Sequence, residues 1–335
     1  MTVIVDGTNG ITYPSTTVQN TAYQTRFKNR IINGDMSIAQ RANSATVTAG
    51  TAVPTSSTGY PAVDRWFVYS TGANVTAAQV AGSNNTQNNY QITGAASVTV
   101  VGVGQRIENN NSYDLAGQTV TLSVNISNSL LTNVTWTASY ANTSNTFGTI
   151  GTPTKVQIST GTFVVNSTLS QYSTQISLPS NATTGVEILF TVGAQTSGTW
   201  VIGNAQLELG NAASSFEVVD YGTDLLMCQR YFYVNQATNA YSGFVTGALI
   251  SGTELQGVIY YATIMRTTPS FSSSGNFETL TNGTARSTTL AIGGTEMSAT
   301  TCTIKGTLAG ATGGQSGVLR ASNDATAKLL FTAEL

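Results

Sequence analysis

Residues 118–127, QTVTLSVNIS, decide the fold class of this 335-residue chain. Their apolar side chains fall on alternate positions, with threonine, serine and asparagine between them. A period of two residues is typical of a strand with one buried and one polar face. The alternation recurs in residues 133–140 and 186–192, and clusters of Gly, Asn and Ser such as residues 82–89 separate the runs. The sequence therefore predicts an all-β chain folded as a β-sandwich or jelly roll.

The composition excludes several functions. Charged residues make up 8% of the chain, and the 13 Lys and Arg form no basic cluster, so we expect no nucleic-acid binding. The absence of histidine removes the usual general base at neutral pH and the commonest metal ligand. The N-terminus does not resemble a signal peptide, and no apolar run approaches the roughly 20 residues of a membrane span. We therefore expect synthesis in a cytoplasm and no membrane insertion.

The later part of the chain predicts a helix and a second β domain. Residues 223–233, TDLLMCQRYFY, have apolar side chains at helical spacing, with Asp224 as the expected N-cap. Residues 254–264, ELQGVIYYATI, are apolar on both faces of a strand. Such a strand lies either in the centre of a sandwich or against another subunit. We expect a connecting helix in residues 221–236 and a smaller β-sandwich-like domain in residues 237–335.

Two distant stretches resemble a known kind of module. Residues 28–41, KNRIINGDMSIAQR, and 59–67, GYPAVDRWF, resemble the opening of many phage tail and fibre proteins. Residues 200–217, WVIGNAQLELGNAASSFE, resemble the close of the same module, before a helix carrying CQRY. Together they bracket a domain similar to carbohydrate-binding modules of the jelly-roll type. The resemblance implies such a jelly roll in residues 31–220, preceded by a fibre segment in residues 1–30 that attaches to the particle.

The two ends of the chain extend the resemblance to phage receptor-binding proteins. Residues 10–22, GITYPSTTVQNTA, resemble a repeat found where phage fibres begin, and residues 265–271, MRTTPSF, with the closing AEL resemble their C-terminal domains. The resemblance implies a bacteriophage virion protein of the tail or fibre, made in the host cytoplasm. It also implies a homotrimer that contacts other tail or capsid proteins through its N-terminus. The host-facing C-terminal domain would help it adhere to a bacterial surface glycan.

Catalysis is not expected. Glycoside hydrolysis needs two carboxylates placed across the scissile bond, and no spacing links a pair among the 15 Asp and Glu. Serine nucleophiles have no histidine base. Two alternatives to adhesion stay open: a purely structural virion protein, such as a capsid decoration or tail connector, and a polysaccharide depolymerase.

Candidate glycan ligands lie on one strand. Alternation in residues 200–209 places Trp200, Asn204 and Gln206 on the face opposite the core, with a ring to stack on a sugar and amides to bind its hydroxyls. The alternative is that Trp200 packs at the edge of the sandwich. Trp66 and Trp136 are expected to be core residues.

Three more residues are candidate ligands, two of them for a glycan in the second domain and one for a metal ion. Tyr241 and Tyr261 lie near Gly-rich turns and are further glycan candidates, although packing is the alternative for each. The resemblance implies a structural calcium near the first strand, for which Asp35 is the candidate ligand. No other cofactor is expected. Cys228 and Cys302 are expected to be buried free thiols rather than a disulfide.

Overall fold

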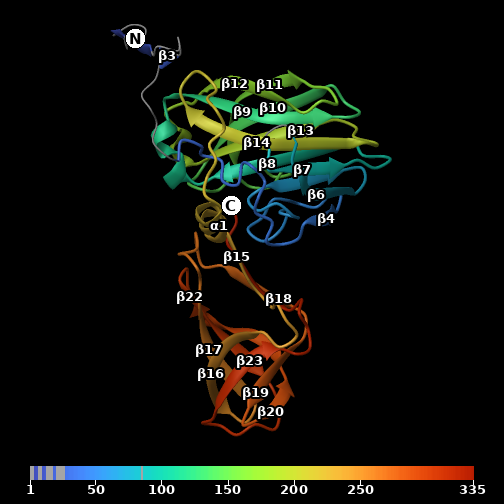
Figure 1. Ribbon diagram of the computed structural model, residues 1–335, viewed down its shortest axis with the longest axis vertical. Helices are drawn as coiled ribbons and strands as arrows, with labels where there is room; N and C mark the ends of the chain where they lie inside the picture. The colour runs from blue at the N-terminus through green and yellow to red at the C-terminus, as the bar shows by residue number, and fades with distance from the viewer. Residues whose placement is uncertain (1–3, 7–9, 13–17, 20–26, 84–85) are drawn as a thin grey trace.

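The computed structural model describes residues 4–6, 10–12, 18–19, 27–83 and 86–335. Figure 1 shows a larger β-sandwich, a second β domain beyond it, and the helix α1 (Tyr221–Gln229) between them. The predicted all-β class, with a jelly roll followed by a short helix and a smaller β domain, is confirmed. Within the described residues, no helix is long and apolar enough to span a membrane.

Two antiparallel sheets form the sandwich. One sheet has the order β11-β10-β13-β8-β5 and the other the order β12-β9-β14-β7-β6-β4. The strands of the first are β5 (Phe67–Thr71), β8 (Val100–Ile107), β10 (Asn133–Ala141), β11 (Lys155–Val164) and β13 (Val186–Val192). Those of the second are β4 (Ser44–Val47), β6 (Val75–Ala81), β7 (Asn88–Thr93), β9 (Thr119–Asn128), β12 (Ser170–Ser177) and β14 (Thr199–Leu209). The chain changes sheet repeatedly, as jelly-roll connections require.

The core of the sandwich follows the predicted alternation. In β9 the side chains of Val120, Leu122, Val124 and Ile126 are all fully buried between the sheets. The predicted core positions of Trp66 and Trp136 are confirmed as well, since both side chains belong to this core and are 0% and 7% exposed. Three short 3-10 helices, η1 (Asn109–Asn111), η2 (Tyr113–Leu115) and η3 (Ala182–Thr184), lie in the loops that connect these strands.

The helix begins at Tyr221, where the predicted connecting helix begins, but it ends before the predicted residue 236 and is capped by a different residue. Asp220, not Asp224, is the N-cap, and its carboxylate accepts a hydrogen bond from the Thr223 amide at 3.2 Å. Asp224 lies in the first turn and instead accepts from the amide of Asn33 in the sandwich. The helix ends at Gln229, because the following residues pair as strand β15 (Phe232–Gln236) with β24 (Lys328–Thr332).

The second domain has two sheets. A small sheet has the order β15-β24-β18, and a larger one the order β20-β19-β23-β16-β17-β22-β21. Their remaining strands are β16 (Gly243–Ser251), β17 (Glu254–Tyr260), β18 (Ser270–Ser274), β19 (Phe277–Thr281), β20 (Thr284–Ser287), β21 (Thr289–Met297), β22 (Thr301–Thr307) and β23 (Ser316–Ala321). β19 and β21 come from opposite ends of the larger sheet yet contact each other, so this sheet is strongly curled. Cys302 lies buried in it as a free thiol, as does Cys228 in α1, which confirms both predictions.

The doubly apolar strand has one exposed face. In β17, Leu255 and Ile259 are buried, whereas Val258 and Tyr260 are 46% and 74% exposed. Ile264, just beyond the strand, is 61% exposed. Burial of both faces in the centre of a sandwich is therefore wrong for the single chain, and contact with another subunit stays a prediction.

The N-terminal fibre segment is described only in part. β1 (Ile4–Asp6), β2 (Gly10–Thr12) and β3 (Val18–Gln19) form a small antiparallel sheet. The rest of residues 1–26, and with them most of the segment predicted to attach to the particle, lies outside the described residues.

Candidate functional site

Buried charges tie the two domains together at a joint formed by α1, the loops before β5 and the segment that follows β24. Arg65 donates to the carboxylate of Glu334, and both side chains are at most 1% exposed. Arg41 pairs with the same carboxylate at 3.2 Å. The Arg65 guanidinium also donates to the carbonyl of Arg106 at 2.6 Å and lies 3.5 Å from the ring centre of Tyr231. Because a buried charge is costly without partners, this network fixes the domains to each other.

A second ion pair forms the wall of a cavity at the same joint. Glu108, which follows β8, accepts from Nε and Nη2 of Arg230 at 3.0 and 2.8 Å and from the Tyr231 hydroxyl at 2.9 Å. Burial alone would raise the pKa of Glu108, but the hydrogen bonds and charge of Arg230 outweigh it and hold that pKa below its usual value. The carboxylate is therefore ionised at neutral pH and holds the guanidinium in place.

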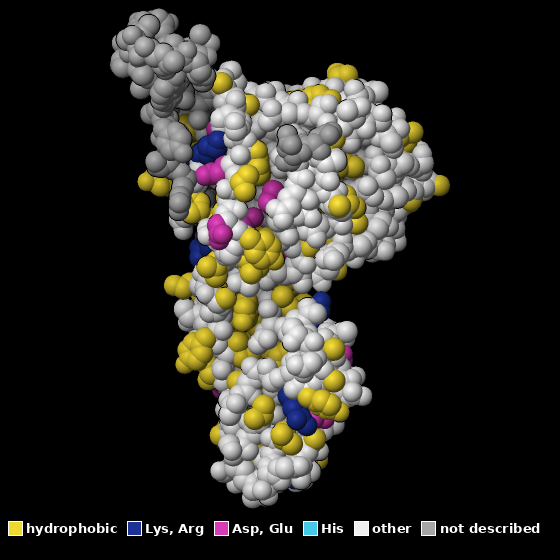
Figure 2. Space-filling model, viewed as in Figure 1, with side chains coloured by type: hydrophobic (Ala, Val, Ile, Leu, Met, Phe, Trp, Pro, Cys, Tyr) yellow, Lys and Arg dark blue, Asp and Glu magenta, His cyan; other side chains and the backbone are white. Residues whose placement is uncertain are grey.

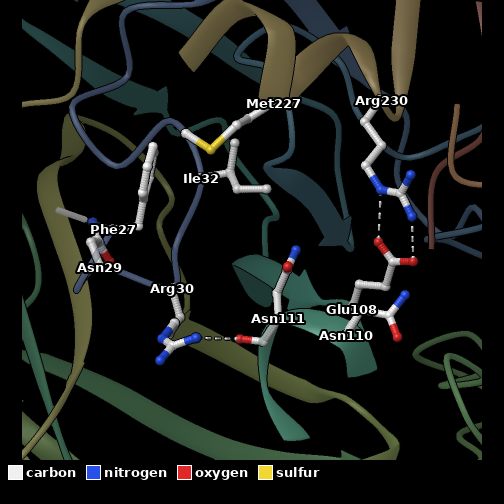
Figure 3. Close-up of a pocket in the computed structure, with 9 residues that line it drawn as sticks. All are labelled: Phe27, Asn29, Arg30, Ile32, Glu108, Asn110, Asn111, Met227 and Arg230. Carbon is white, nitrogen blue, oxygen red and sulfur yellow. Dashed lines mark hydrogen bonds and ion pairs between the residues drawn. The ribbon is translucent and has the colours of Figure 1, made fainter. Parts of the chain in front are cut away.

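The cavity beside this pair, here called the joint pocket, has a volume of about 430 Å³. This is within the range of roughly 300–1,000 Å³ that is usual for small-molecule sites. Its lining residues come from the segment before β4, from η1 and its N-cap, and from α1 and its C-cap, and Figure 3 shows them around one space. The lining residues are Phe27, Asn29, Arg30, Ile32, Glu108, Asn110, Asn111, Met227 and Arg230.

One side of the joint pocket is apolar. In Figure 3 the side chains of Phe27, Ile32 and Met227 lie together on the side away from the Glu108–Arg230 pair. The Phe27 ring is 52% exposed, and Ile32 and Met227 are half-buried. An exposed ring next to aliphatic side chains offers a surface on which the apolar face of a ligand can lie.

The other side of the joint pocket is polar but carries no unpaired charge. The side-chain amides of Asn110 and Asn111 have no hydrogen-bond partner within the described part of the chain, and Asn110 is exposed. Arg30 pairs with Asp114 at 2.7 Å. Since Arg230 is held by Glu108, the pocket presents amides and a ring rather than free ions. Figure 2 shows the same character over one face of the molecule, where uncharged side chains and backbone dominate and charged groups are scattered.

The predicted sugar-stacking role of Trp200 is wrong. Its side chain is fully buried and belongs to the sandwich core, so the alternative of packing holds. The pairing of β14 with β9 shifts register between Gly203 and Gln206, at a β-bulge where Asn204 has a φ of +44°. A bulge changes the face to which side chains point. Trp200 therefore faces the core before the bulge, as Leu207 does after it, and a strict alternation assigned them to opposite faces.

The amides of the same strand are also buried. Gln206 has no exposed surface, and it accepts from the amide of Glu217 at 2.8 Å and donates to Glu208 at 2.9 Å. It therefore anchors the segment that leads to α1 and is not available to a sugar. Asn204 is 8% exposed. The structure does not bring these residues to the joint pocket.

The two tyrosine candidates differ in exposure. Tyr261 is 8% exposed and packs in the second core, with its ring centre 5.0 Å from that of Phe331. A glycan role for Tyr261 is therefore wrong. Tyr241 is 52% exposed, and its ring lies 4.9 Å from the Arg320 guanidinium. Of the five predicted glycan ligands, Tyr241 alone is largely exposed, and it does not line the joint pocket.

Asp35, the predicted calcium ligand, lies close enough to the carboxylate of Asp224 to affect its pKa. Its own oxygens accept from the amide and hydroxyl of Ser37 at 3.2 and 2.6 Å. Burial, and next the charge of Asp35, raise the pKa of Asp224 to about 6. Within the described residues, no group of three or more His, Cys, Asp or Glu side chains is placed to hold a metal. A calcium ion usually takes six to eight oxygen ligands. The acidic side chains therefore do not by themselves make such a site, and calcium stays a prediction.

Sequence reasoning missed the joint pocket because its residues come from three separate segments. Phe27 and Ile32 precede the first strand of the sandwich, Asn110 and Asn111 follow β8, and Met227 is in α1. No local spacing connects them. The run of asparagines at residues 109–111, directly after a buried strand, was the available signal.

Comparisons with known proteins gave no family model and no curated protein that matches the chain. Solved structures do resemble it. A CBM4 structure has 13% identity over 53% of this chain and 98% of its own, with a TM-score of 0.35. A putative sugar binding protein from Bacteroides thetaiotaomicron has 14% identity over 54% and 100%, with a TM-score of 0.36. The enzymatically active domain of tailspike protein 4 of bacteriophage CBA120 has 16% identity over 56% of this chain and 22% of its own, with a TM-score of 0.34.

Proposed function

We propose that this chain is a bacteriophage tail or fibre protein that adheres to a bacterial surface glycan without cleaving it. The observation that carries the proposal is the chemistry of the joint pocket, where an exposed ring faces unpartnered amides and all charges are paired. A sugar offers an apolar ring face and many hydroxyls, and this pocket supplies a partner for each. The charged side chains that line it are paired within the chain, so a neutral ligand meets no free ion there.

The way the phage-like stretches pack together supports the assignment to a virion. The Asn33 side chain donates to the carbonyl of Asp64, and Trp66 Nε1 donates back to the carbonyl of Asn33 at 3.0 Å. These contacts join residues 28–41 to residues 59–67. The closing AEL and the CQRY segment meet the same unit through Glu334 and Tyr231, as described above. Four stretches that resemble phage proteins thus pack into one structural unit.

Self-association belongs to the proposal. The exposed apolar side chains of Val258, Tyr260 and Ile264 lie on and beside the outer face of β17. Large apolar side chains gathered on an exposed strand mark an interaction surface. We assign this surface to neighbouring copies of the chain in a homotrimeric fibre, with residues 1–30 held by other tail or capsid proteins and the C-terminal domain facing the host.

A non-catalytic role is supported by how the buried acids are used. Glu108, Glu187, Glu278 and Glu334 are each paired with an arginine within the described residues. The hydrogen bonds and charge of Arg230 keep the pKa of Glu108 below its usual value, whereas a general acid needs a raised pKa. These groups therefore serve the structure.

The test is binding of the full chain to an array of bacterial surface polysaccharides, followed by analysis of polysaccharide length. We expect binding that Phe27→Ala and Asn111→Ala each weaken at least tenfold, with no shortening of the chains. Tyr241→Ala serves as the matched control, since it removes an equally exposed ring outside the pocket. Loss of binding in Tyr241→Ala alone would move the site to the C-terminal domain. Binding to no glycan would favour a structural virion protein, and shortened chains would favour a depolymerase.

A further inference from the structure

We propose that the joint pocket selects neutral sugars that carry a methyl group, as an N-acetyl group or as the methyl of a 6-deoxy sugar. The inference rests on the proposed function and names the ligand class of that site. It follows from three features of the pocket: an apolar corner, amides placed opposite it, and the pairing of every charge at its wall.

The apolar corner is formed by Ile32 and Met227, next to the Phe27 ring. Neither Ile32 nor Met227 is fully buried within the chain, so each leaves aliphatic surface facing the cavity. A sugar ring covers an aromatic side chain with its own C–H groups, but most of the groups at the edge of the ring are hydroxyls. A hydroxyl placed there would lose its hydrogen bonds to water. A methyl group loses nothing and gains from burial.

The polar side of the pocket suits the rest of such a sugar. The amides of Asn110 and Asn111 can donate and accept, so they match either ring hydroxyls or the carbonyl and N–H of an acetamido group. Figure 3 shows Asn111 across the pocket from Met227. A ligand that places its methyl group against Met227 therefore directs its polar edge toward the asparagines.

The charges of the pocket disfavour acidic sugars. Arg230 is held by two hydrogen bonds to Glu108, and Arg30 is paired with Asp114. A carboxylate on the ligand would compete with these acids for the same guanidinium groups and would approach the ionised Glu108. A neutral sugar meets no such repulsion.

The experiment compares sugars that differ in one group. The full chain is tested with three pairs of sugars: L-rhamnose and L-mannose, L-fucose and L-galactose, and N-acetylglucosamine and glucose. Glucuronate is tested as the acidic sugar. Binding is measured by titration calorimetry and by competition with array binding. We expect the methyl-bearing member of at least one pair to bind about five- to tenfold more tightly, consistent with one methyl group in an apolar site. The first two pairs report a 6-deoxy preference and the third an N-acetyl preference.

Two variants test whether the apolar corner formed by Ile32 and Met227 causes the preference for methyl-bearing sugars. Met227→Gln keeps the length of the side chain and should reduce the ratio within the preferred pair to below twofold. Leu226→Ala changes the neighbouring exposed residue of α1, which does not line the pocket, and should leave the ratio unchanged. Equal binding within all three pairs, or tighter binding of glucuronate, would overturn the inference while adhesion to polysaccharide stands. If the chain binds no glycan of any kind, the proposed function fails with it.

Discussion

Arg65 and Glu334 are 269 positions apart in sequence and form an ion pair in which neither side chain is more than 1% exposed. The pair joins the loop before β5 in the sandwich to the segment after β24 in the second domain. The stability of the joint therefore depends on a contact between residues 269 positions apart in a chain of 335 residues.

Removing one member of this pair should destabilise the chain strongly. Glu334→Ala leaves Arg65 buried without its counter-ion, and we expect a loss of about 3–5 kcal/mol in the free energy of unfolding. Chemical denaturation monitored by fluorescence measures it. Glu296→Gln is the control, because the Lys305–Glu296 pair is 27% and 38% exposed and should contribute about 1 kcal/mol or less. Equal losses in the two variants would contradict the structural role of the buried pair.

The stability of the chain should depend on the ionisation of Asp224. Its pKa is raised to about 6 in the folded state, from an ordinary value of 3.8, by burial and then by Asp35. The folded state thus binds the proton more tightly, so stability is highest below the ordinary pKa and falls as the pH rises through about 6. Asp224→Asn keeps the oxygen that accepts from Asn33. It should raise the free energy of unfolding at pH 8 by about 3 kcal/mol at most, since one pKa unit corresponds to about 1.4 kcal/mol.

Thermal melts of the wild-type chain and Asp224→Asn from pH 4 to pH 8 separate this effect from others. Asp64 has a pKa of about 6 as well, because of its burial, so part of the pH dependence should persist in the variant. Asp35→Asn should give a smaller gain at pH 8, since it removes only the repulsion. A variant that melts in parallel with the wild-type chain at every pH would refute the prediction.

Gly102 should tolerate no side chain. The ring of Tyr69, on the neighbouring strand β5, lies across β8 where a Cβ at Gly102 would be, so the two would overlap. We expect Gly102→Ala to cost about 1–3 kcal/mol, since the ring must move within a packed cluster. Gly151→Ala is the matched control, because no atom lies within 4 Å of its Cβ position. A neutral Gly102→Ala would mean that the Tyr69 ring moves away freely.

The exposed face of β17 should govern self-association. Tyr260→Ser removes the most exposed large apolar side chain of that strand, and Ile264→Ser removes its neighbour beyond the strand end. Sedimentation velocity should show the oligomer of the wild-type chain dissociating in the double variant. Val164→Ser, 72% exposed on β11 of the sandwich, should leave association unchanged. An unchanged oligomer in the double variant would place the contact between copies elsewhere.

The fold was predictable because its determinants are local. Alternation in β9 and at Trp136 depends on neighbours two residues apart, and the structure keeps it. Prediction failed where the backbone departs from regular geometry, as at the bulge in β14 that returns Trp200 to the core. It also failed where the partner is remote, as when Asp224 binds Asn33 rather than capping its own helix. The joint pocket combines both difficulties, since it forms only when loops and α1 are brought together.

The route of the chain through the joint has a mechanical consequence. The polypeptide crosses from the sandwich to the second domain before β15 and returns after β24, and these two strands pair along five positions from Phe232–Thr332 to Gln236–Lys328. A force that pulls the second domain away from the sandwich is thus shared by two antiparallel strands, because both connect to the joint at the same end of the pair. The connection between the two domains therefore acts as a double tether instead of a single flexible linker.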